Sequence, residues 1–482
     1  LNCKILIKLI IKMKVVITTS GIGKRLGNYT EFNNKTLVRV GNKFTICYII
    51  EKYPKESEFI ITLGYYGDFV KQFLIMAYPD YDFTFINIDK YEGKGSSLGY
   101  SLLQTKDSIN SNFIYHCCDC IFLDNIIIDE ITEHNCMFVY KGENNSNNYN
   151  IFSSVNVGNK FVSKVNDKGE TNSDFFYIGV AHIKNYKLFF EILELYVNNN
   201  YYNESLSDIH IYKEFLKKSI NINYKVINNW YDMGTLTTFN NANEYLTCSY
   251  NILYKQKESI CFLKDYVIKF FFDNTINQNR VKRGQILKKL VPNIIEHSNN
   301  YYKMELIDGK LMSEHYQYGE IYKLLNWSQE KMWSKIGDLD EKYFKSICKK
   351  FYYNKTMERI NKFMINNNDK EYNKINGLEV GTINELINKT DFDLLSDSIP
   401  SHFHGDFILD NILKVENEFC LLDWRQDFCG ELEYGDMYYD LGKLQHNIIL
   451  NHNNLENNMF YIKETNNGCE LDIKCNYFLI QK

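Results

Sequence analysis

The chain has 482 residues, which is too long for one hydrophobic core and predicts two or three domains. Its composition is globular, with 45% hydrophobic and 15% aromatic residues, and a net charge of −5 provides no basic surface for nucleic acid. We find no cleavable signal, and the 13 cysteines of so long a chain favour free thiols in a reducing cytoplasm over a secreted disulfide framework.

The chain starts with an apolar stretch, residues 1–12, that contains three lysines. It is too short to span a bilayer, so we expect no membrane insertion. Met13 directly precedes the first expected strand, and we expect the natural chain to begin there.

Strands and helices are expected to alternate in the first part of the chain. Apolar strand patterns occupy residues 14–19, 59–63, 83–88 and 112–116, and helical patterns occupy about 44–52, 67–77 and 97–105. This rhythm is typical of βαβ units in a mostly parallel sheet. It predicts a Rossmann-like α/β fold with its site at the carboxyl ends of the strands. A closing helix at 236–246 would end this domain, which we place at 13–246.

The first expected strand runs into a turn that contains Gly21, Gly23 and Arg25. The glycines let the backbone approach phosphates, and the arginine supplies a fixed cationic fork. Lys35 follows ten residues later, in Asn-Asn-Lys-Thr-Leu-Val-Arg-Val. Together they resemble the signature of the sugar nucleotidyltransferases, Gly-x-Gly-x-Arg and Pro-Lys-x-Leu-x-x-Val, with Asn34 in place of the proline. The resemblance implies that Arg25 and Lys35 are catalytic residues that act on the triphosphate.

Two aspartates extend this resemblance. Asp119 ends the apolar stretch 113–119, and Asp232 lies in Trp-Tyr-Asp-Met-Gly-Thr at 230–235. Both match the family's metal-binding aspartates. The resemblance implies that they hold Mg²⁺ between the α-phosphate of a nucleotide and the incoming phosphate oxygen.

A glycine- and serine-rich loop at 91–99 precedes an expected helix and contains Gly93 and Gly95. It matches the place where the family binds the base and ribose of the nucleotide. The alternative is an ordinary turn that caps the helix. Because backbone groups would read the base, CTP, UTP and dTTP all stay open.

A second motif lies near the other end of the chain, in His-Gly-Asp-Phe-Ile-Leu-Asp-Asn at 404–411 and Leu-Asp-Trp at 422–424. Asp406, Asn411 and Asp423 have the spacing that phosphoryl transfer from a magnesium nucleotide requires. The first would accept the proton of an attacking hydroxyl, and the other two would hold Mg²⁺. A buried polar turn before a core strand is the alternative.

This motif resembles that of the aminoglycoside phosphotransferase and choline kinase family. Asp-Met-Tyr-Tyr-Asp-Leu-Gly-Lys at 436–443 is similar to a large-lobe motif of the same family. The resemblance implies a bilobal, protein-kinase-like α+β domain at 247–482, β-rich at first and helical from about residue 318. It also implies that Lys269 binds the α- and β-phosphates of ATP and that Glu305 lies in the hinge that contacts adenine.

Two expected features of such a kinase are missing from the sequence. The helix expected at about 275–290 contains no glutamate to pair with Lys269, and residues 248–264 contain no glycine. An exposed strand lysine therefore remains the alternative for Lys269.

The two resemblances predict a bifunctional enzyme of surface-glycan precursor synthesis. One domain would join a sugar phosphate or a phosphocholine-like molecule to a nucleoside monophosphate and release pyrophosphate. The other would use ATP to phosphorylate a small-molecule hydroxyl. The missing glutamate leaves an alternative open, a nucleotidyltransferase with a non-catalytic, nucleotide-sensing kinase-like domain.

Overall fold

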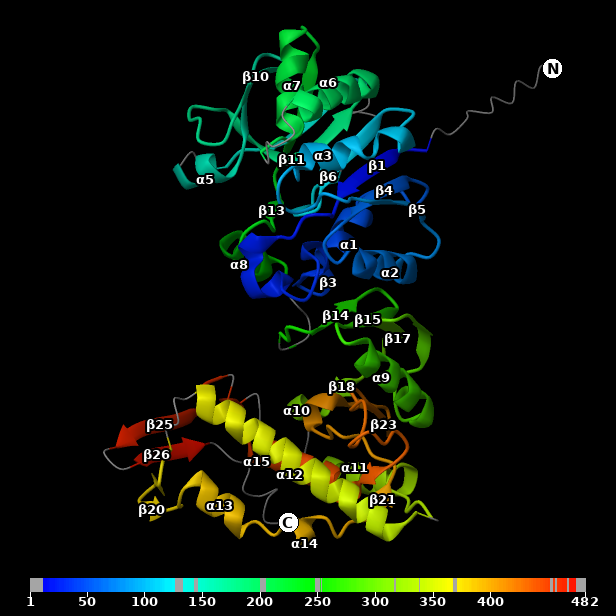
Figure 1. Ribbon diagram of the computed structural model, residues 1–482, viewed down its shortest axis with the longest axis vertical. Helices are drawn as coiled ribbons and strands as arrows, with labels where there is room; N and C mark the ends of the chain where they lie inside the picture. Colours follow the sequence, from blue (N-terminus) through cyan, green and yellow to red (C-terminus); the bar gives the residue numbers. More distant parts are fainter. Residues whose placement is uncertain are drawn as a thin grey trace, which may run out of the picture. The chain divides into compact units, whose positions relative to one another are not determined.

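The structure, a computed structural model, describes residues 12–473 apart from several short segments. These are 126–132, 143–145, 200–204, 248–251, 253, 316–317, 338, 367–370, 451–453, 456 and 466–467. The expectations for residues 1–11 fall outside the described part. The chain divides into two compact units, Leu1–Phe272 and Asp273–Lys482 (Figure 1). The domain boundary expected near residue 246 stays a prediction.

The first unit is built on a mixed sheet with the strand order β10-β9-β11-β6-β1-β4-β5, in which β8 pairs with β11 and β12. Its strands are β1 (Lys14–Thr18), β4 (Glu58–Leu63), β5 (Asp82–Asn87), β6 (Phe113–Cys117), β8 (Asn135–Tyr140), β9 (Ser154–Val157), β10 (Val162–Asn166), β11 (Phe175–Ile183) and β12 (Ile222–Ile227). β6, β1, β4 and β5 run parallel, whereas β11 is antiparallel to β6 and β8. The expected α/β sheet is confirmed, but it is mixed rather than mostly parallel, because β9, β10 and β11 pair antiparallel with their neighbours. The four expected strands lie within one residue of their predicted ends.

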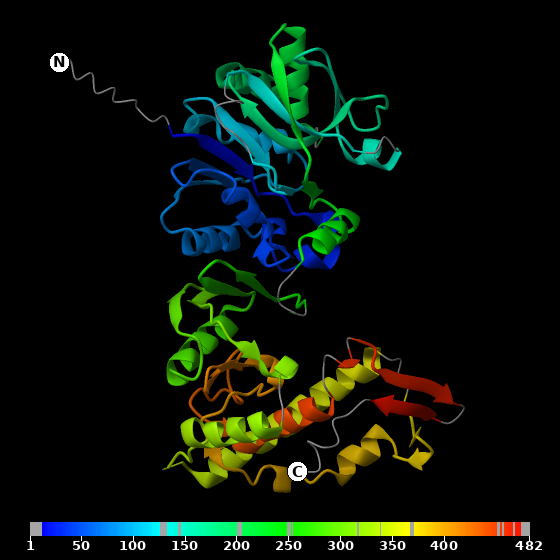
Figure 2. The ribbon, with the colours of Figure 1, turned by 180° about the vertical axis from the view of Figure 1, so that it is seen from behind.

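Helices cover both faces of this sheet. The helices of the unit are α1 (Thr45–Ile50), α2 (Gly67–Ala77), α3 (Leu98–Leu103), α5 (Ser146–Ile151), α6 (Tyr186–Asn199), α7 (Asp208–Lys217) and α8 (Leu236–Tyr245), with short 3-10 turns η1 (Lys24–Thr30), η2 (Lys35–Leu37) and η3 (Lys106–Ser108). In Figures 1 and 2, α3, α6 and α7 lie on one side of β1 and β4, and α1 and α2 lie on the other.

Alternating side chains explain why both faces are covered. Val16 of β1 and Ile60 of β4 belong to the core beneath α3, α6 and α7. Val15 and Ile61 are also fully buried, and neighbouring residues on a strand point to opposite faces. The strands are therefore apolar on both faces, as parallel strands usually are.

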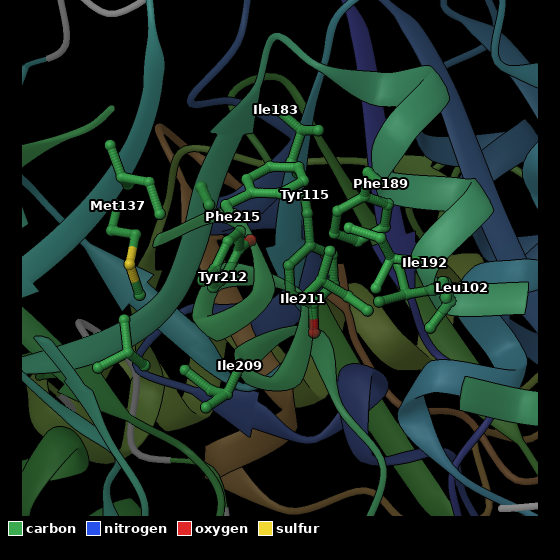
Figure 3. Close-up of a cluster of buried hydrophobic side chains, with 14 of the residues drawn as sticks. Leu102, Tyr115, Met137, Ile183, Phe189, Ile192, Ile209, Ile211, Tyr212 and Phe215 are labelled. Atoms are coloured by element: carbon green, nitrogen blue, oxygen red, sulfur yellow. The ribbon is translucent and has the colours of Figure 1, made fainter. Parts of the chain in front are cut away.

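The core beneath α3, α6 and α7 joins the helices to the centre of the sheet (Figure 3). Leu102 of α3, Phe189 of α6 and Phe215 of α7 meet Tyr115 of β6 there, and all four are nearly inaccessible to solvent. This packing fixes the strands whose carboxyl ends carry the candidate site.

Short strands complete the first unit. They are β2 (Arg39–Val40), β3 (Lys43–Phe44), β7 (Cys120–Phe122), β13 (Trp230–Asp232), β14 (Glu258–Phe262) and β15 (Tyr266–Phe271). The β14–β15 hairpin confirms the strand pattern expected after residue 258, and it packs on α2. Tyr266 donates a hydrogen bond of 2.7 Å to the carbonyl of Ala77, and the ring of Phe270 lies 5.0 Å from that of Phe69. These contacts explain why the hairpin belongs to the first compact unit.

The second unit begins with α9 (Asn274–Ile286) and is mostly helical from Met312 to Leu395. Its further helices are α10 (Met312–His315), α11 (Tyr318–Lys331), α12 (Glu341–Asn366), α13 (Ile383–Lys389), α14 (Phe392–Leu395), η4 (Leu409–Asn411) and α15 (Met437–Ile449). Its strands are β16 (Ile294–His297), β17 (Tyr301–Glu305), β18 (Lys310–Leu311), β19 (Lys374–Ile375), β20 (Leu378–Glu379), β21 (Pro400–Ser401), β22 (Ile412–Val415), β23 (Glu418–Leu421), β24 (Gly435–Asp436), β25 (Phe460–Thr465) and β26 (Gly468–Ile473). The helical pattern expected from residue 318 is confirmed.

The long helix α12 packs against α15 through aromatic side chains. Phe351 of α12 lies 4.1 Å from Phe428 and 5.1 Å from Tyr439, measured between ring centroids. Phe403, just before the His-Gly-Asp loop, joins the same cluster. The loop is thereby anchored to the helical part of the unit. Within the described residues, no helix combines the length and the apolarity needed to cross a membrane.

Candidate functional site

The two aspartates expected to bind a metal in the first unit lie side by side. Asp119 directly precedes β7, which pairs antiparallel with β13, and Asp232 is the last residue of β13. The amide of Met233 donates a hydrogen bond of 2.7 Å to the carbonyl of Asp119. The short ladder therefore brings together two carboxylates that are far apart in the sequence.

Lys35 completes this group. Its Nζ lies 3.0 Å from Oδ2 of Asp119, and each side chain is only 19% exposed. Burial alone would raise the pKa of Asp119, but the charge and the hydrogen bond of Lys35 lower that pKa to about 2. Asp119 is therefore ionised at neutral pH.

The second carboxylate has a different environment. Asp232 accepts hydrogen bonds from the hydroxyl of Thr238, at 2.7 Å, and from the amide of Gly234, at 3.2 Å. Burial and the charge of Asp119 raise its pKa to about 6. Two such carboxylates are the hard oxygen ligands that Mg²⁺ prefers, and a cation between them would relieve their repulsion. The residues therefore fit the expected Mg²⁺.

Arg25 and the turn glycines lie beside this pair. Nη2 of Arg25 would be 3.3 Å from a Cβ atom built on Gly234, so the missing side chain leaves room for the guanidinium. Gly23 has a φ of 74°, and a Cβ atom there would lie 2.9 Å from Cβ of Lys35. The turn can thus pack closely on Lys35. A Cβ atom on Gly21 would meet nothing within 4 Å, so packing does not explain that glycine.

Asn34, which replaces the family's proline, fixes the position of Lys35 in another way. Its Nδ2 donates to the carbonyls of Thr19, at 2.9 Å, and Tyr65, at 2.6 Å. Its Oδ1 accepts from the amide of Thr36 at 2.9 Å, and the residue is fully buried. These bonds tie the lysine to the end of β1, a role that the sequence did not reveal.

The loop at 91–99 forms the helix cap that was one of its two interpretations. Ser97 accepts a hydrogen bond of 2.9 Å from the amide of Tyr100 and begins α3. Gly93 and Gly95 have φ values of 71° and 92°, and a Cβ atom on Gly93 would meet nothing within 4 Å. The cap leaves open space beside the first glycine, and nucleotide binding by this loop stays a prediction.

Sequence reasoning missed two features of this site. Lys168, in the turn after β10, lies within range of the charges of Arg25, Asp119 and Asp232. A cavity of about 310 Å³ also opens beside Asp232. Its aromatic lining consists of Tyr140, Phe152, Phe176, Trp230, Tyr231 and Tyr245. Neither feature has a local sequence signal, because the contributing residues come from separate elements.

In the second unit the His-Gly-Asp loop brings Asp406 and Asn411 together. Nδ2 of Asn411 donates to the carbonyl of Asp406 at 3.0 Å and to its Oδ2 at 3.2 Å. Lys443 of α15 contacts the other carboxylate oxygen, Oδ1, at 2.7 Å. The amide of Leu422 donates to the carbonyl of Asn411 at 2.7 Å, which places Asp423 near this pair.

Asp440 anchors the His-Gly-Asp loop through hydrogen bonds to its backbone. Its two carboxylate oxygens accept from the amides of His404 and Gly405, at 2.7 Å each, and Oδ2 also accepts from Nε1 of Trp333 at 3.2 Å. Asp440 is fully buried, and burial raises its pKa to about 6. It is a positioning residue, and it belongs to the 436–443 motif that the sequence matched without assigning it this role.

The helix α9, which lacks the glutamate expected to pair with Lys269, carries an arginine that contacts Asp423. Nη1 of Arg280 lies 2.5 Å from Oδ1 of Asp423, and the backbone carbonyl of Arg280 accepts from Nε1 of Trp424 at 2.8 Å. Asp423 itself has a φ of 56°. The carboxylate expected to hold Mg²⁺ thus forms an ion pair within the protein.

The other two candidates lie in different units. Lys269 is a buried residue of β15 in the first unit. Glu305 ends β17 in the second unit and lines a cavity of about 750 Å³ together with residues of α9, β16 and β23. Their expected contacts with ATP stay predictions.

No protein-family model matches the chain, and no curated protein does. Solved structures of nucleotidyltransferases match the N-terminal half. A CTP:phosphocholine cytidylyltransferase from Streptococcus pneumoniae is 20% identical with a TM-score of 0.42, over 49% of this chain and 100% of that one. An inositol-1-phosphate CTP transferase from T. maritima is 16% identical with a TM-score of 0.40, over 49% and 94%. A Bacillus anthracis protein assigned as a glucose-1-phosphate thymidylyltransferase is 21% identical with a TM-score of 0.41, over 51% and 98%.

Proposed function

We propose that the N-terminal half is a nucleotidyltransferase. It would transfer a nucleoside monophosphate from CTP, UTP or dTTP to a phosphorylated small molecule. The observation that supports this most is the pairing of Asp119 with Asp232 beside Lys35. Two carboxylates next to two cations, one of them in a glycine-containing turn, are what transfer at an α-phosphorus needs.

Each residue has a role in that reaction. A phosphate oxygen of the acceptor attacks the α-phosphorus of the nucleotide, and the bond to the pyrophosphate oxygen breaks. Arg25 and Lys35 offset the negative charge that grows on the departing pyrophosphate. Asp119 and Asp232 would hold Mg²⁺, which when bound supplies further positive charge to the phosphates.

The aromatic cavity beside Asp232 is the proposed place of the acceptor. Its volume of about 310 Å³ suits a small molecule, and Thr238 adds a polar group to its aromatic wall. Aromatic faces accept both the C–H face of a sugar and a quaternary ammonium, which leaves sugar phosphates and phosphocholine-like molecules open. Lys168, within range of the same charges, would contact the acceptor's phosphate.

We propose further that the second half is a small-molecule kinase. The hydroxyl oxygen of the substrate attacks the γ-phosphorus of ATP, ADP leaves, and Asp406 accepts the hydroxyl proton. Asn411 and Asp423 would hold Mg²⁺. The hydrogen bonds that join Asn411 to Asp406 support this assignment. Both activities fit the cytoplasmic synthesis of surface-glycan precursors.

One observation favours a different role for the second half. Arg280 pairs with Asp423, and α9 carries no glutamate for Lys269. Under this alternative the second half binds nucleotide without catalysis and senses it.

Two assays on the full chain separate these functions. Pyrophosphate release is measured with each nucleoside triphosphate and a set of phosphorylated acceptors, and ADP release is measured with ATP and a set of alcohols. We expect pyrophosphate with one acceptor class and ADP with one alcohol class. If no nucleotide yields pyrophosphate, the nucleotidyltransferase proposal is wrong. If ATP binds independently of Mg²⁺ and no alcohol is phosphorylated, the sensor is favoured.

A further inference from the structure

The side of Asp406 away from Asn411 is rich in positive charge. Oδ2 of Asp406 accepts from Asn411, the proposed metal ligand, whereas Oδ1 contacts Nζ of Lys443. One carboxylate oxygen of Asp406 thus faces the proposed metal ligand, and the other faces a lysine. An acceptor hydroxyl must reach Asp406 from the side that the metal ligand leaves open.

Lys355 of α12 reaches the face of α15 that carries Lys443. Its Nζ donates to the hydroxyl of Tyr439 and is 4.3 Å from the centroid of that ring and 4.7 Å from that of Phe351. Tyr439 and Lys443 are four residues apart on α15, so they occupy the same face of the helix. Lys355 and Lys443 thus flank one surface of α15.

Arginines add to this charge. The guanidinium of Arg425 lies 5.2 Å from the ring of Phe351, the same ring that Lys355 covers. Burial and the charges of Arg425, Arg359 and Lys443 lower the pKa of Lys355 to about 7, against the opposing charge of Asp406. Cations held this close together repel one another, and a bound anion would relieve the repulsion.

We infer that the cluster of Lys355, Arg359, Arg425 and Lys443 binds an anionic group of the acceptor, so that the second half phosphorylates a hydroxyl of an acidic small molecule. The inference rests on the proposed kinase activity. The anionic group is a phosphate or a carboxylate, as in a sugar phosphate or a hydroxy acid. A cationic acceptor would be repelled by the same residues.

The bonds formed and broken are those of the proposed kinase reaction. The hydroxyl oxygen of the acidic substrate bonds to the γ-phosphorus of ATP, the bond to the β-phosphate oxygen breaks, and the proton passes to Asp406. A carboxylate oxygen accepts more than one hydrogen bond, so the proton can pass to Oδ1 while Lys443 still contacts it. An anion held by Lys443 and its neighbours would thus place the acidic substrate beside the oxygen that takes the proton.

The test is an ADP-release assay on the full chain with hexose phosphates, glycerate, neutral sugars, choline and amino sugars. Turnover is expected with a hexose phosphate or with glycerate, and which of the two works identifies the anionic group. Lys355→Gln should raise KM for that substrate at least about tenfold and leave KM for ATP unchanged. Lys349→Gln on the same helix, where Lys349 pairs with the exposed Asp393, is the matched control and should change neither.

Other outcomes would overturn the inference. Turnover of cationic or neutral alcohols alone would refute the acidic substrate and leave the kinase in place. An equal rise in KM for ATP would assign the cluster to the nucleotide instead. If no alcohol is phosphorylated, direct binding of a hexose phosphate and glycerate is compared between wild type and Lys355→Gln. Binding that depends on Lys355 would support an anion site without a kinase, and its absence would reject both proposals.

Discussion

The two candidate sites neutralise their carboxylates differently. In the N-terminal site Lys35 pairs with Asp119, while Asp232 accepts from a hydroxyl and an amide, and its pKa is raised to about 6. In the C-terminal site the two acidic residues both contact cations, Asp406 with Lys443 and Asp423 with Arg280. The first site thus retains two carboxylates that repel each other, and a divalent cation between them would reduce that repulsion.

If both sites hold Mg²⁺ as proposed, the first is already arranged for the ion, whereas the second would have to rearrange. In the second unit Mg²⁺ would compete with the guanidinium of Arg280 for Asp423, and a substrate would compete with Asp406 for Lys443. We therefore expect the proposed nucleotidyl transfer to need no conformational change in the acidic residues of the first site. The kinase-like half should respond more steeply to its ligands.

The strongest way to break this comparison is Asp119→Asn. It removes the carboxylate charge of a proposed metal ligand beside the departing pyrophosphate. Nucleotidyl transfer should therefore fall at least about a hundredfold while ATP-dependent phosphorylation persists. Pyrophosphate and ADP release are measured on the same preparation. Arg25→Ala should act similarly and spare the fold, because Arg25 is an exposed residue of a turn. If pyrophosphate is still released by Asp119→Asn, the proposed metal site is wrong.

Two substitutions in the other site should fail differently. Asp406→Asn loses the proton acceptor, so it should bind Mg-ATP normally and turn over at least about a hundredfold more slowly. Asp423→Asn should instead lose the Mg²⁺-dependent part of ATP binding. Binding isotherms with and without Mg²⁺, combined with ADP release, distinguish the two. If wild-type affinity already ignores Mg²⁺, the sensor replaces the kinase.

Much of the first unit was predictable from the sequence because its signals are local. Apolar alternation located β1, β4, β5 and β6, and the turn residues located Arg25 and Lys35. The match to a known motif order then singled out Asp119 and Asp232, which the β7–β13 ladder brings together. The loop at 91–99 shows the limit of such signals, since the same glycines and serines serve a helix cap and a ligand loop.

The residues that sequence reasoning missed act through distant contacts. Asp440 holds a loop that lies 35 residues earlier, and Arg280 reaches Asp423 across 143 residues. The aromatic cavity combines side chains of β8, β13 and α8 with residues between them. Nothing in the local pattern of any one of these segments indicates its partner, so a single sequence could not reveal them.

Arg280→Met sharpens the comparison further. Removing the guanidinium takes away the ion pair that Arg280 forms with the carboxylate of Asp423, which should destabilise the second unit in the absence of ligand. Mg-ATP should then stabilise the variant more than it stabilises wild type, with about tenfold tighter Mg²⁺-dependent binding if the ion pair gates the site. The melting temperature is measured with and without Mg-ATP. An unchanged ligand shift would show that Arg280 does not compete with Mg²⁺.

Two buried aspartates, Asp440 and Asp119, should respond to pH with opposite signs. The folded-state pKa of Asp440 is raised to about 6, so its contribution to stability is fully present below about pH 4 and is lost as the pH rises through 6. The pKa of Asp119 is lowered to about 2, so its contribution is present above about pH 4 and is lost as the pH falls through 2.

Asp440→Asn tests the first of these signs. Between pH 4 and 6 the wild type should lose about 2 kcal/mol of stability that the variant does not lose. The quantity measured is the difference between the unfolding free energies of wild type and variant at each pH. Taking that difference cancels the other buried acids, which titrate in both proteins. A difference that stays constant over this range would mean that Asp440 is ionised throughout.

The smallest expected effect concerns Asn34, where the family signature has proline. The φ of Asn34 is −75°, so a proline ring would fit the backbone. Proline would, however, remove the side-chain bonds to Thr19, Tyr65 and Thr36, and with its missing N–H also the bond that the Asn34 amide donates to Oδ1 of Asn33. With these four bonds at about 0.5–1 kcal/mol each, partly offset by the stiffer unfolded chain, Asn34→Pro should destabilise the protein by about 2 kcal/mol.

Asn34→Ala is the control for this change, because it removes the side-chain bonds but keeps the backbone N–H bond to Asn33 and adds no ring. Chemical denaturation should rank wild type above both variants, which should lie within about 1 kcal/mol of each other because the stiffer unfolded chain of the proline variant offsets its lost N–H bond. Lys35 should also become less well placed in both variants, so that KM for the nucleotide rises with the loss of stability. If the proline variant equals wild type in stability and in KM, the ring positions Lys35 as well as the asparagine bonds do, and the two residues are equivalent solutions at this turn.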